Sequence, residues 1–384
     1  MLKYFLFIAA LFMASMVGAQ NAPTPKETKE LRTITDTLRI FTSKKLRVTP
    51  ITYQKEVTLK IDTLSFMAVG DIMMGTDFPD ASYLPEKGAY PFQKVDSVFR
   101  KTDILFGNLE GTLTDEGENA KHCKDPKKCY SFRSPEYLGS HLQRAGFDVM
   151  SIANNHIGDF GDVGISNTIS TLDSLGIANA GVYDKTFTTF TKDSIKYGFC
   201  AFAPNTDTPK IQNYKKAIAR VKMLKDSCDI VIVSFHGGAE GTDHLNVTRK
   251  TEKFYGEDRG NVYEFAHKMI DAGADIIFGH GPHITRAVEV YKNRFIAYSL
   301  GNFCTYKRFN LNGVKGYAPI VEVRTTKDGI FLEGKVHSAK QLDGVYPFMD
   351  KKEGALSEIK RLTAMDFPET GLIFTEDGYF RLPN

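Results

Sequence analysis

The sequence lacks three features that would assign it to a specialised class of proteins. Its 384 residues carry a formal net charge of only +3, which gives no support for nucleic-acid binding, because that function usually needs a concentrated basic face. It has no internal repeat and no low-complexity tract. With 42% hydrophobic and 25% charged residues, the composition is that of an ordinary globular protein, long enough for one large α/β domain or two smaller ones.

Cysteine is scarce, with five residues in the chain. Cys123 and Cys129 flank the polar loop CKDPKKC, and outside the cytoplasm they could form a local disulfide. A zinc-binding pair is the weaker reading, because the spacing is wider than zinc sites usually show. The other three, Cys200, Cys228 and Cys304, lie in or beside apolar runs and are expected to be small core residues.

A long apolar run occurs only at the N-terminus. Residues 1–19 have a charged start at Lys3, an apolar stretch and a small-residue site ending at Ala19, which is typical of a cleaved secretory signal. The stretch is shorter than the roughly 20 residues of a spanning helix, and no cysteine follows it to carry a lipid. We therefore expect an exported, soluble protein in the periplasm or on the extracellular face of the envelope.

The rest of the chain has the pattern of an α/β fold. Residues 20–61 read as a linker that adds a strand near 39–54. From Ser65 onward, short apolar runs alternate with stretches of helical period, which predicts βαβ units and a mainly parallel sheet. The predicted strands are 65–70, 103–108, 147–153, 177–182, 229–235 and 274–279. The predicted helices are 91–101, 134–146, 163–176, 213–227 and 261–273, of which three close on Gly146, Gly176 and Gly273.

After Gly281 the sequence pattern changes and predicts hairpin-like strands over 284–300 and 316–337. A helical stretch follows at 351–365. These patterns predict a main domain over 62–308 and a β-rich C-terminal extension with a terminal helix and tail over 309–384.

Five of the predicted strands end on groups that bind hard or borderline cations. These groups are Asp71, the stretch Asn108–Glu110, Asn154 with Asn155 and His156, His236, and His280 with His283. In an open α/β sheet, ligands bind beyond the carboxyl ends of the strands, so groups spread over the sequence are expected to meet there.

The chemical types of these side chains indicate a metal. Carboxylates, an amide oxygen and imidazoles suit Zn, Mn or Fe, whereas a magnesium site is more often all oxygen. Each residue alone is more often a turn former, a helix cap or a hydrogen-bonded histidine. Their joint occurrence at equivalent strand ends favours one functional site. Glycines flank most of them and allow tight turns and close approach: Gly70, Gly75, Gly107, Gly111, Gly237, Gly238, Gly279 and Gly281.

The ordered set GDIMMG, NLEG, ANNH, HGG, GHGPH and YSLGNF resembles the CapA family of capsule-synthesis proteins, named for poly-γ-glutamate capsule production. The similarity covers about 65–303. The family is similar to the calcineurin-like metallophosphoesterases. The resemblance therefore implies an α/β fold of that type, a four-layer α/β/β/α sandwich, with one or two divalent metal ions (Mn, Zn or Fe) at the strand ends.

The resemblance also implies residue roles. Asp71 would bind one metal, Glu110 would stand in for the usual bridging aspartate, and His156 would be the catalytic imidazole that faces the substrate. The remaining metal ligands would be Asn155, His236, His280 and His283. One departure weakens the pattern: Met73 occupies the place of the histidine that normally follows the first aspartate, which leaves a weak or single-metal site open as an alternative.

Four further positions have less certain roles in this comparison. Asn302 is expected either to lie on the rim of the site, where we assign it a catalytic role, or to brace it. Asn154 and Glu240 are predicted to contact substrate, although Glu240 reads equally as a solvated loop carboxylate. Thr76 follows Gly75, where many relatives carry arginine.

Three functional hypotheses follow. The first is a metal-dependent hydrolase, of phosphoesterase type, acting in the cell envelope on an anionic substrate. The second is an assembly factor for poly-γ-glutamate or another capsule polymer that binds the polymer without hydrolysis, in association with membrane-bound synthesis machinery. The basic stretch KHCKDPKK over 121–128 would suit a polyanion, but a solvated loop is its simpler reading. The third is a scaffold that has lost its metal.

Overall fold

The computed structural model describes residues 27–33, 54–60, 62–121 and 129–383. The chain divides into two units, Met1–Asp62 and Thr63–Asn384. In the first unit, β1 (Glu27–Thr33) pairs antiparallel with β2 (Gln54–Lys60). The signal segment, and almost all of the strand predicted near 39–54, lie outside the described residues.

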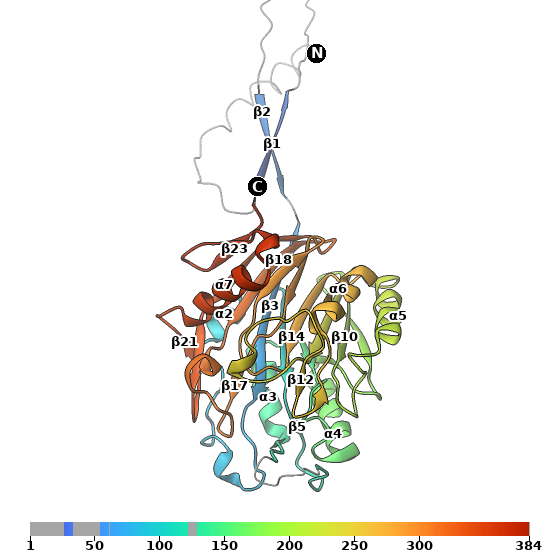
Figure 1. Ribbon diagram of the computed structural model, residues 1–384, viewed down its shortest axis with the longest axis vertical. Coiled ribbons are helices and arrows are strands. Elements are labelled where there is room, and N and C mark those ends of the chain that lie inside the picture. Colours follow the sequence, from blue (N-terminus) through green and yellow to red (C-terminus); the bar gives the residue numbers. More distant parts are fainter. Residues whose placement is uncertain (1–26, 34–53, 61, 122–128, 384) are drawn as a thin grey trace, which may run out of the picture. The chain divides into compact units, whose positions relative to one another are not determined.

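The second unit contains two large sheets (Figure 1). The nine-stranded sheet has the order β22-β23-β19-β18-β3-β4-β7-β8, and β17 pairs with β3 off this path. Strands β17, β3, β4, β7 and β8 run parallel, and the remaining strands are antiparallel. Their bounds are β3 Thr63–Met73, β4 Ile104–Leu109, β7 Val149–Ser151, β8 Ala178–Ala180, β17 Asn302–Thr305, β18 Ile320–Thr326, β19 Phe331–His337, β22 Ile373–Phe374 and β23 Tyr379–Arg381.

The six-stranded sheet has the order β15-β16-β14-β11-β10-β9. Its four central strands are parallel, and an antiparallel strand closes each edge. The bounds are β9 Phe187–Lys192, β10 Ile195–Phe202, β11 Ile230–His236, β14 Ile276–His280, β15 Val288–Tyr291 and β16 Arg294–Ala297. Small two-stranded pairs are β5 Thr112–Leu113 with β6 Arg133–Ser134, β12 Lys253–Phe254 with β13 Glu257–Asp258, and β20 Ala339–Leu342 with β21 Val345–Met349.

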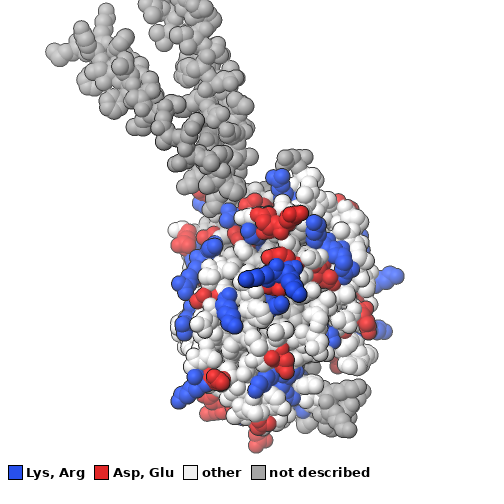
Figure 2. Space-filling model, turned by 90° about the vertical axis from the view of Figure 1, so that its left-hand side faces the viewer, with Lys and Arg blue, Asp and Glu red and all other residues white. Residues whose placement is uncertain are grey.

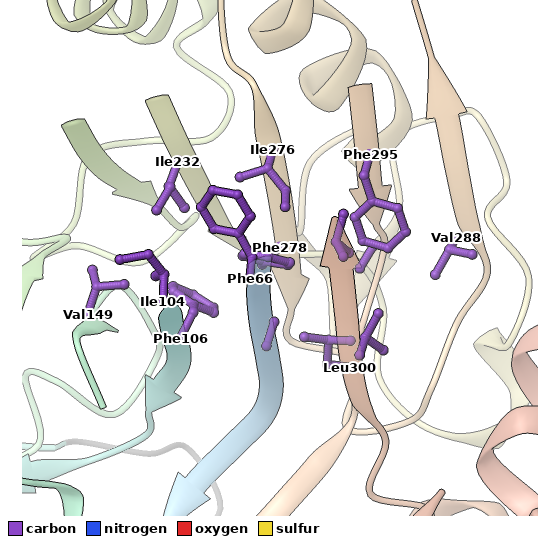
Figure 3. Packing of buried hydrophobic residues seen from close by; sticks show 14 of the residues in the cluster. Phe66, Ile104, Phe106, Val149, Ile232, Ile276, Phe278, Val288, Phe295 and Leu300 are labelled. Carbon is purple, nitrogen blue, oxygen red and sulfur yellow. The ribbon is translucent and has the colours of Figure 1, made fainter. Parts of the chain in front are cut away.

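The two sheets pack face to face through one apolar cluster (Figure 3). Phe66 and Phe106 from the nine-stranded sheet meet Ile232, Ile276 and Phe278 from the six-stranded sheet, and the Phe106 and Phe278 rings stack with centroids 4.9 Å apart. Complete burial of such side chains contributes about 1.5–3 kcal/mol each. The apolar residues of both sheets therefore fix the strands, and with them the strand ends.

Helices cover the outer faces. A second cluster joins the nine-stranded sheet to α2 (Asp96–Phe99), α3 (Gly139–Ala145) and α4 (Gly161–Ser174). A third cluster joins the six-stranded sheet to α5 (Tyr214–Lys225) and α6 (Val262–Ala272). The last helix, α7 (Gly354–Asp366), contributes to the first and third clusters. The α/β fold class predicted from the sequence is confirmed.

The helix ends follow local sequence rules. The side chain of Asn213 accepts a hydrogen bond from Lys216 N and caps α5, and Asn261 caps α6 through Glu264 N. At the other end, Gly273 takes the left-handed conformation with φ 114°. Gly146 and Gly176 also have positive φ where their helices end, as predicted.

Two predicted elements differ from the structure, and one central strand was not predicted. The strand expected to stop before Asp71 continues to Met73, because β17 pairs with Asp71–Met73. The helix expected at 91–101 is reduced to the single turn Asp96–Phe99. The central strand β10 had no prediction; Lys196 and Gly198 interrupt its apolar residues.

The C-terminal segment is not a separate extension. Strand β18 pairs with β3 over seven residue pairs, from Ile320–Val69 to Thr326–Thr63, and β19 and β23 continue the sheet from β18. The sheet that carries Asp71 is thus completed by residues beyond the boundary predicted near residue 308, within the same compact unit. Pairing between strands so far apart in the chain leaves no local signal in the sequence.

Other features of the described chain bear on the predictions. Cys129 is disulfide-bonded, whereas Cys200, Cys228 and Cys304 are free and buried. The predicted partner of Cys129, Cys123, lies outside the described residues, as does nearly all of the basic stretch over 121–128. Within the described residues, no helix has the length and apolarity needed to cross a bilayer. The face shown in Figure 2 carries basic and acidic side chains interspersed.

Candidate metal centre

The parallel strands of the two sheets place the predicted ligands in register. In the nine-stranded sheet, Asp71 of β3 lies opposite Asn108 of β4 and Asn302 of β17. In the six-stranded sheet, His236 of β11 lies opposite His280 of β14. The strand ends therefore bring together residues that are far apart in the sequence.

Two glycines permit the close approach of these strand ends. A Cβ atom at Gly70 would lie 2.0 Å from the carbonyl oxygen of Gly301, and one at Gly281 would lie 2.7 Å from Gly237 N. Gly281 also has φ 117°, which side-chain-bearing residues rarely adopt. These positions need glycine because backbone occupies the space where a side chain would be.

Asp71, Glu110 and His283 form the tightest group of possible ligands. One ligand atom from each lies within 4.8 Å of the others. His283 Nδ1 is 3.0 Å from Asp71 Oδ2, and its Nε2 is 3.4 Å from Glu110 Oε1. Burial alone would lower the pKa of His283, but the charges of Glu110 and Asp71 outweigh it and raise the pKa to about 10. The group concentrates negative charge where a cation is needed to balance it.

Asp71 itself is held as a carboxylate. Burial works against its charge, but the imidazoles of His280 and His283 outweigh this effect and keep the pKa of Asp71 well below its usual value. His280 Nδ1 lies 3.2 Å from Asp71 Oδ1.

Several other ligand atoms of this cluster are buried and lack hydrogen bonds among the described residues. They are both oxygens of Glu110, both ring nitrogens of His236 and of His280, and Oδ1 of Asn155. Buried polar atoms are nearly always paired in folded proteins, because an unpaired one costs about 1–3 kcal/mol. Oxygen and imidazole donors that converge without partners fit a divalent cation. We call Asp71, Glu110, Asn155, His236, His280 and His283 the metal centre.

Asn108, which the sequence places with Glu110 at the end of a predicted strand, also lies in this region. Its Nδ2 donates to Asp71 Oδ1 at 2.9 Å, and its Oδ1 is buried without a hydrogen bond in the described structure. The amide therefore orients the Asp71 carboxylate. Its position in the NLEG motif, two residues before Glu110, was the available signal.

His156 is oriented by the carboxylate of Asp159, a residue that was not predicted from the sequence. Burial raises the pKa of Asp159, but His156 and Lys121 outweigh it and lower the pKa, so Asp159 is ionised. His156 Nδ1 lies 2.7 Å from Asp159 Oδ2 and 3.0 Å from Lys121 Nζ. Its other nitrogen, Nε2, then faces Glu110 Oε1 at 4.0 Å. The signal was the spacing of three residues in the stretch HIGD.

Asn302 has a bracing position. Its Nδ2 donates to the carbonyl oxygens of His283 and Lys315, both at 3.1 Å, and the side chain is buried. These contacts fix the turn that carries His283. These contacts favour the bracing role; Oδ1 of Asn302 is buried without a hydrogen bond in the described structure, and its predicted catalytic role stays a prediction.

Asn154 ties the ANNH turn to β4. It is buried, its Oδ1 accepts from His156 N at 3.0 Å, and its Nδ2 donates to Leu109 O at 2.8 Å. Its predicted contact with substrate stays a prediction.

Glu240 lies at the edge of the centre. Its Oε1 is 3.1 Å from Arg259 Nη2, and 22% of its side chain is exposed. Arg259 was not singled out in the sequence, because it lies further along the chain in a polar loop.

Met73 occupies the position at which the calcineurin-like metallophosphoesterases, in the resemblance described above, carry a histidine. Met73 is fully buried and offers no imidazole. His283 instead lies against Asp71 and Glu110. Thr76 is also buried, and its Oγ1 accepts from the backbone N–H groups of Phe78 and Arg133, which ties the first strand end to β6.

Comparisons with known proteins identify the family of the chain. The profile of the family "Bacterial capsule synthesis protein PGA_cap" matches residues 65–307. The PGA biosynthesis protein CapA of Bacillus subtilis is 33% identical over 270 residues, which cover 65% of this chain and 65% of the relative. The capsule biosynthesis protein CapA of Bacillus anthracis is 29% identical over 262 residues, which cover 63% of this chain and 60% of the relative. The alignments thus span somewhat under two thirds of either relative.

One solved structure illustrates the distance to characterised enzymes. The 5′-nucleotidase precursor from Thermus thermophilus matches with a TM-score of 0.40 and 11% identity, covering 79% of this chain and 59% of that chain. So low a TM-score carries no weight for fold or function. The family match, in contrast, includes every residue of the metal centre. The chain belongs to the bacterial capsule synthesis protein family PGA_cap.

Proposed function

We propose that the protein is an exported metal-dependent hydrolase, of phosphoesterase type, that acts in the biosynthesis of an anionic capsule polymer. One observation carries the proposal: buried carboxylate, amide and imidazole atoms converge at the strand ends without hydrogen-bond partners in the described structure. The N-terminal signal pattern and the names of the curated relatives support the location and the pathway.

The metal centre would hold one or two divalent cations of the Mn, Zn or Fe type. Asp71, Glu110 and His283 form one candidate group of ligands. His236, His280 and Asn155 supply the remaining free donor atoms, and Glu110 has both oxygens unpaired. A bound cation would supply Lewis acidity that polarises a phosphoryl or carbonyl oxygen and activates water.

The chain's own residues would position a proton beside the cation. Asp159 Oδ2 lies 2.7 Å from His156 Nδ1, and with the proton on Nδ1 the Nε2 lone pair would face the centre. Burial lowers the pKa of His156 and favours the neutral ring. His156 Nε2 can therefore accept a proton from, or return one to, a group that reacts at the centre. The ring of Phe132, 4.3 Å away between centroids, shields the imidazole from solvent.

A second candidate function is supported by a specific observation. Met73 removes one of the ligands that the resembled superfamily carries, and the curated relatives are named for polymer biosynthesis. A protein with a single weak metal could serve as an assembly factor that binds poly-γ-glutamate without hydrolysing it, together with membrane-bound synthesis machinery.

The metal content of the purified mature protein tests the proposal. We expect at least one equivalent of Mn, Zn or Fe by mass spectrometry after reconstitution, and its loss in Asp71→Ala and His280→Ala. The variant His141→Ala is the matched control. His141 lies on α3, away from the strand ends, and its ring packs against the ring of Tyr90. A screen of phosphate esters follows.

Two results would count against the proposal. If the wild-type protein takes up no metal, the hydrolase hypothesis is excluded and polymer binding becomes the leading hypothesis. Metal bound without any turnover of phosphate esters would favour the assembly factor.

A further inference from the structure

Arg259 is a buried cation at the edge of the metal centre. It is 3% exposed, and its backbone is fixed from two sides: Arg259 N donates to Glu252 O, and Gly238 N donates to Arg259 O, each at 2.9 Å. The second contact ties Arg259 to the turn that follows His236. Its guanidinium is therefore held in place relative to β11.

The guanidinium lacks the acceptors that a buried arginine normally has. Arg259 Nε and Nη2 make no hydrogen bond within the described residues. The nearest carboxylate is that of Glu240, 3.1 Å from Nη2, which pairs by charge but without hydrogen-bond geometry. A buried charge with incomplete hydrogen bonding is costly, so an additional acceptor is expected at this place.

A neighbouring arginine is more completely paired: both terminal nitrogens of Arg286 have hydrogen bonds, and only its Nε has none in the described structure. Arg286 is fully buried and binds both carboxylate oxygens of Glu252, at 3.0 and 2.8 Å, and the carbonyl oxygen of Ala239 at 3.1 Å. Glu252 also accepts from Ala239 N. Glu252 is therefore fully engaged by Arg286 and Ala239, and Glu240 is the acidic partner of Arg259.

Arg259 and Glu240 both flank the turn that leaves β11 after His236 of the metal centre. Gly238, two residues after His236, donates its N–H to Arg259 O at 2.9 Å, and Glu240 lies two residues further along the same turn, 3.1 Å from Arg259 Nη2. The pair therefore lies beside the strand end that carries a ligand of the metal centre. Because 22% of the Glu240 side chain is exposed, its carboxylate is the part of the pair that solvent reaches.

We propose that Arg259 is the subsite for a second anionic group of the substrate, a phosphate or a carboxylate, and that this group displaces the Glu240 carboxylate from the guanidinium. Planar, bidentate pairing with such oxyanions is the property in which arginine differs from lysine. The inference rests on the proposed function, because it names the kind of substrate that would reach the metal centre: one with two anionic groups, such as successive units of an anionic polymer.

The test uses the mature, metal-loaded protein with two probes, inorganic phosphate and a γ-linked glutamate oligomer, in titration calorimetry. We expect Arg259→Gln to weaken binding of the preferred probe about 10- to 100-fold. Glu240→Gln should strengthen it, because the competing carboxylate is gone. The matched control is Arg294→Gln: Arg294 also has one acidic neighbour, Asp275 at 3.5 Å, and one buried unpaired nitrogen, but it lies at the opposite end of the six-stranded sheet.

The opposite signs of the two changes separate ligand binding from a structural role. A salt bridge that only stabilises the fold would make both variants weaker or leave both unchanged, and either result overturns the inference. If Arg259→Gln does not fold, the sign of the Glu240→Gln effect decides. The probe that binds identifies the anion as phosphate or carboxylate. Wild-type protein that takes up metal but binds neither probe would refute the subsite alone, whereas absence of metal would refute the proposed hydrolase.

Discussion

Two buried clusters of charged residues lie beside the turn that follows β11, and they differ in how completely their atoms are paired. In the first, the Arg286 cluster, Arg286, Glu252 and the backbone of Ala239 are joined by four hydrogen bonds, and Nε of Arg286 is the one polar side-chain atom of the pair left without one in the described structure. In the second, the metal centre, Glu110, His236 and His280 are equally buried, yet none of their side-chain polar atoms has a hydrogen bond in the described structure.

This difference separates a structural cluster from a binding one. A closed network stabilises the loop that carries it and has no capacity left for a ligand. An open cluster costs folding free energy and is maintained only where a ligand supplies the missing partner. Burial and charge alone do not distinguish the two; the hydrogen-bond inventory does.

The largest expected effect on stability comes from opening the closed cluster. Arg286→Met should lower the free energy of unfolding by about 3–5 kcal/mol, because it leaves Glu252 as a buried, unpaired carboxylate. Chemical denaturation measures this change. The double variant Arg286→Met with Glu252→Gln should recover a large part of the loss, since the orphan charge is removed. A single variant as stable as wild type would show that the closed network is not structural.

The open cluster should behave in the opposite way. In metal-free protein, Glu110→Gln should leave the free energy of unfolding unchanged or raise it, since it removes a fully buried carboxyl group that has no hydrogen bond in the described structure. With free metal at about 1,000 times Kd, wild type should gain about 4 kcal/mol that the variant does not. Thermal unfolding with and without metal measures both. Equal stabilisation of wild type and variant by metal would contradict the assignment of Glu110.

A smaller effect is expected from the residue that orients His156. Asp159→Asn should reduce turnover about 10- to 100-fold at unchanged metal content, because Nδ1 of His156 loses the acceptor that fixes its proton. Asp173→Asn is the matched control, since Asp173 lies on α4 in a half-exposed pair with Lys185. Loss of metal from the Asp159 variant would show that Asp159 supports the ligands instead of the imidazole.

The smallest effect concerns a third cluster of charged residues, Glu322 and Arg324 on β18 with His337 on β19. None of these residues is a predicted metal ligand. Burial raises the pKa of Glu322, but His337 and Arg324 outweigh it and lower the pKa. A lowered folded-state pKa stabilises the protein above the unfolded value and loses that contribution as the pH falls through the folded value. Glu322→Gln should therefore cost about 1–2 kcal/mol at about pH 7 and less at about pH 3. A cost that does not depend on pH would contradict this reading.

Much of the metal centre could be predicted from sequence because parallel strands impose one rule. Their carboxyl ends share an edge, so polar residues that follow apolar runs converge there. Asp71, Glu110, His236 and His280 follow this rule. Asp159 and Arg259 do not follow this rule. Asp159 contacts His156 and Arg259 contacts Glu240 only in the folded chain, and a polar residue in a loop has no distinguishing sequence pattern.

The sequence by itself determined the α/β class, the helix ends at Gly146, Gly176 and Gly273, and the strand ends that carry the ligands. These features depend on apolar periodicity and on the conformational freedom of glycine, which are local properties. Tertiary structure alone decided that β18 completes the sheet beside β3, that Asn154 and Asn302 brace turns, and which buried charges are paired. Hydrogen bonds between distant segments form only when the sheets have packed, so no short stretch of the chain encodes them.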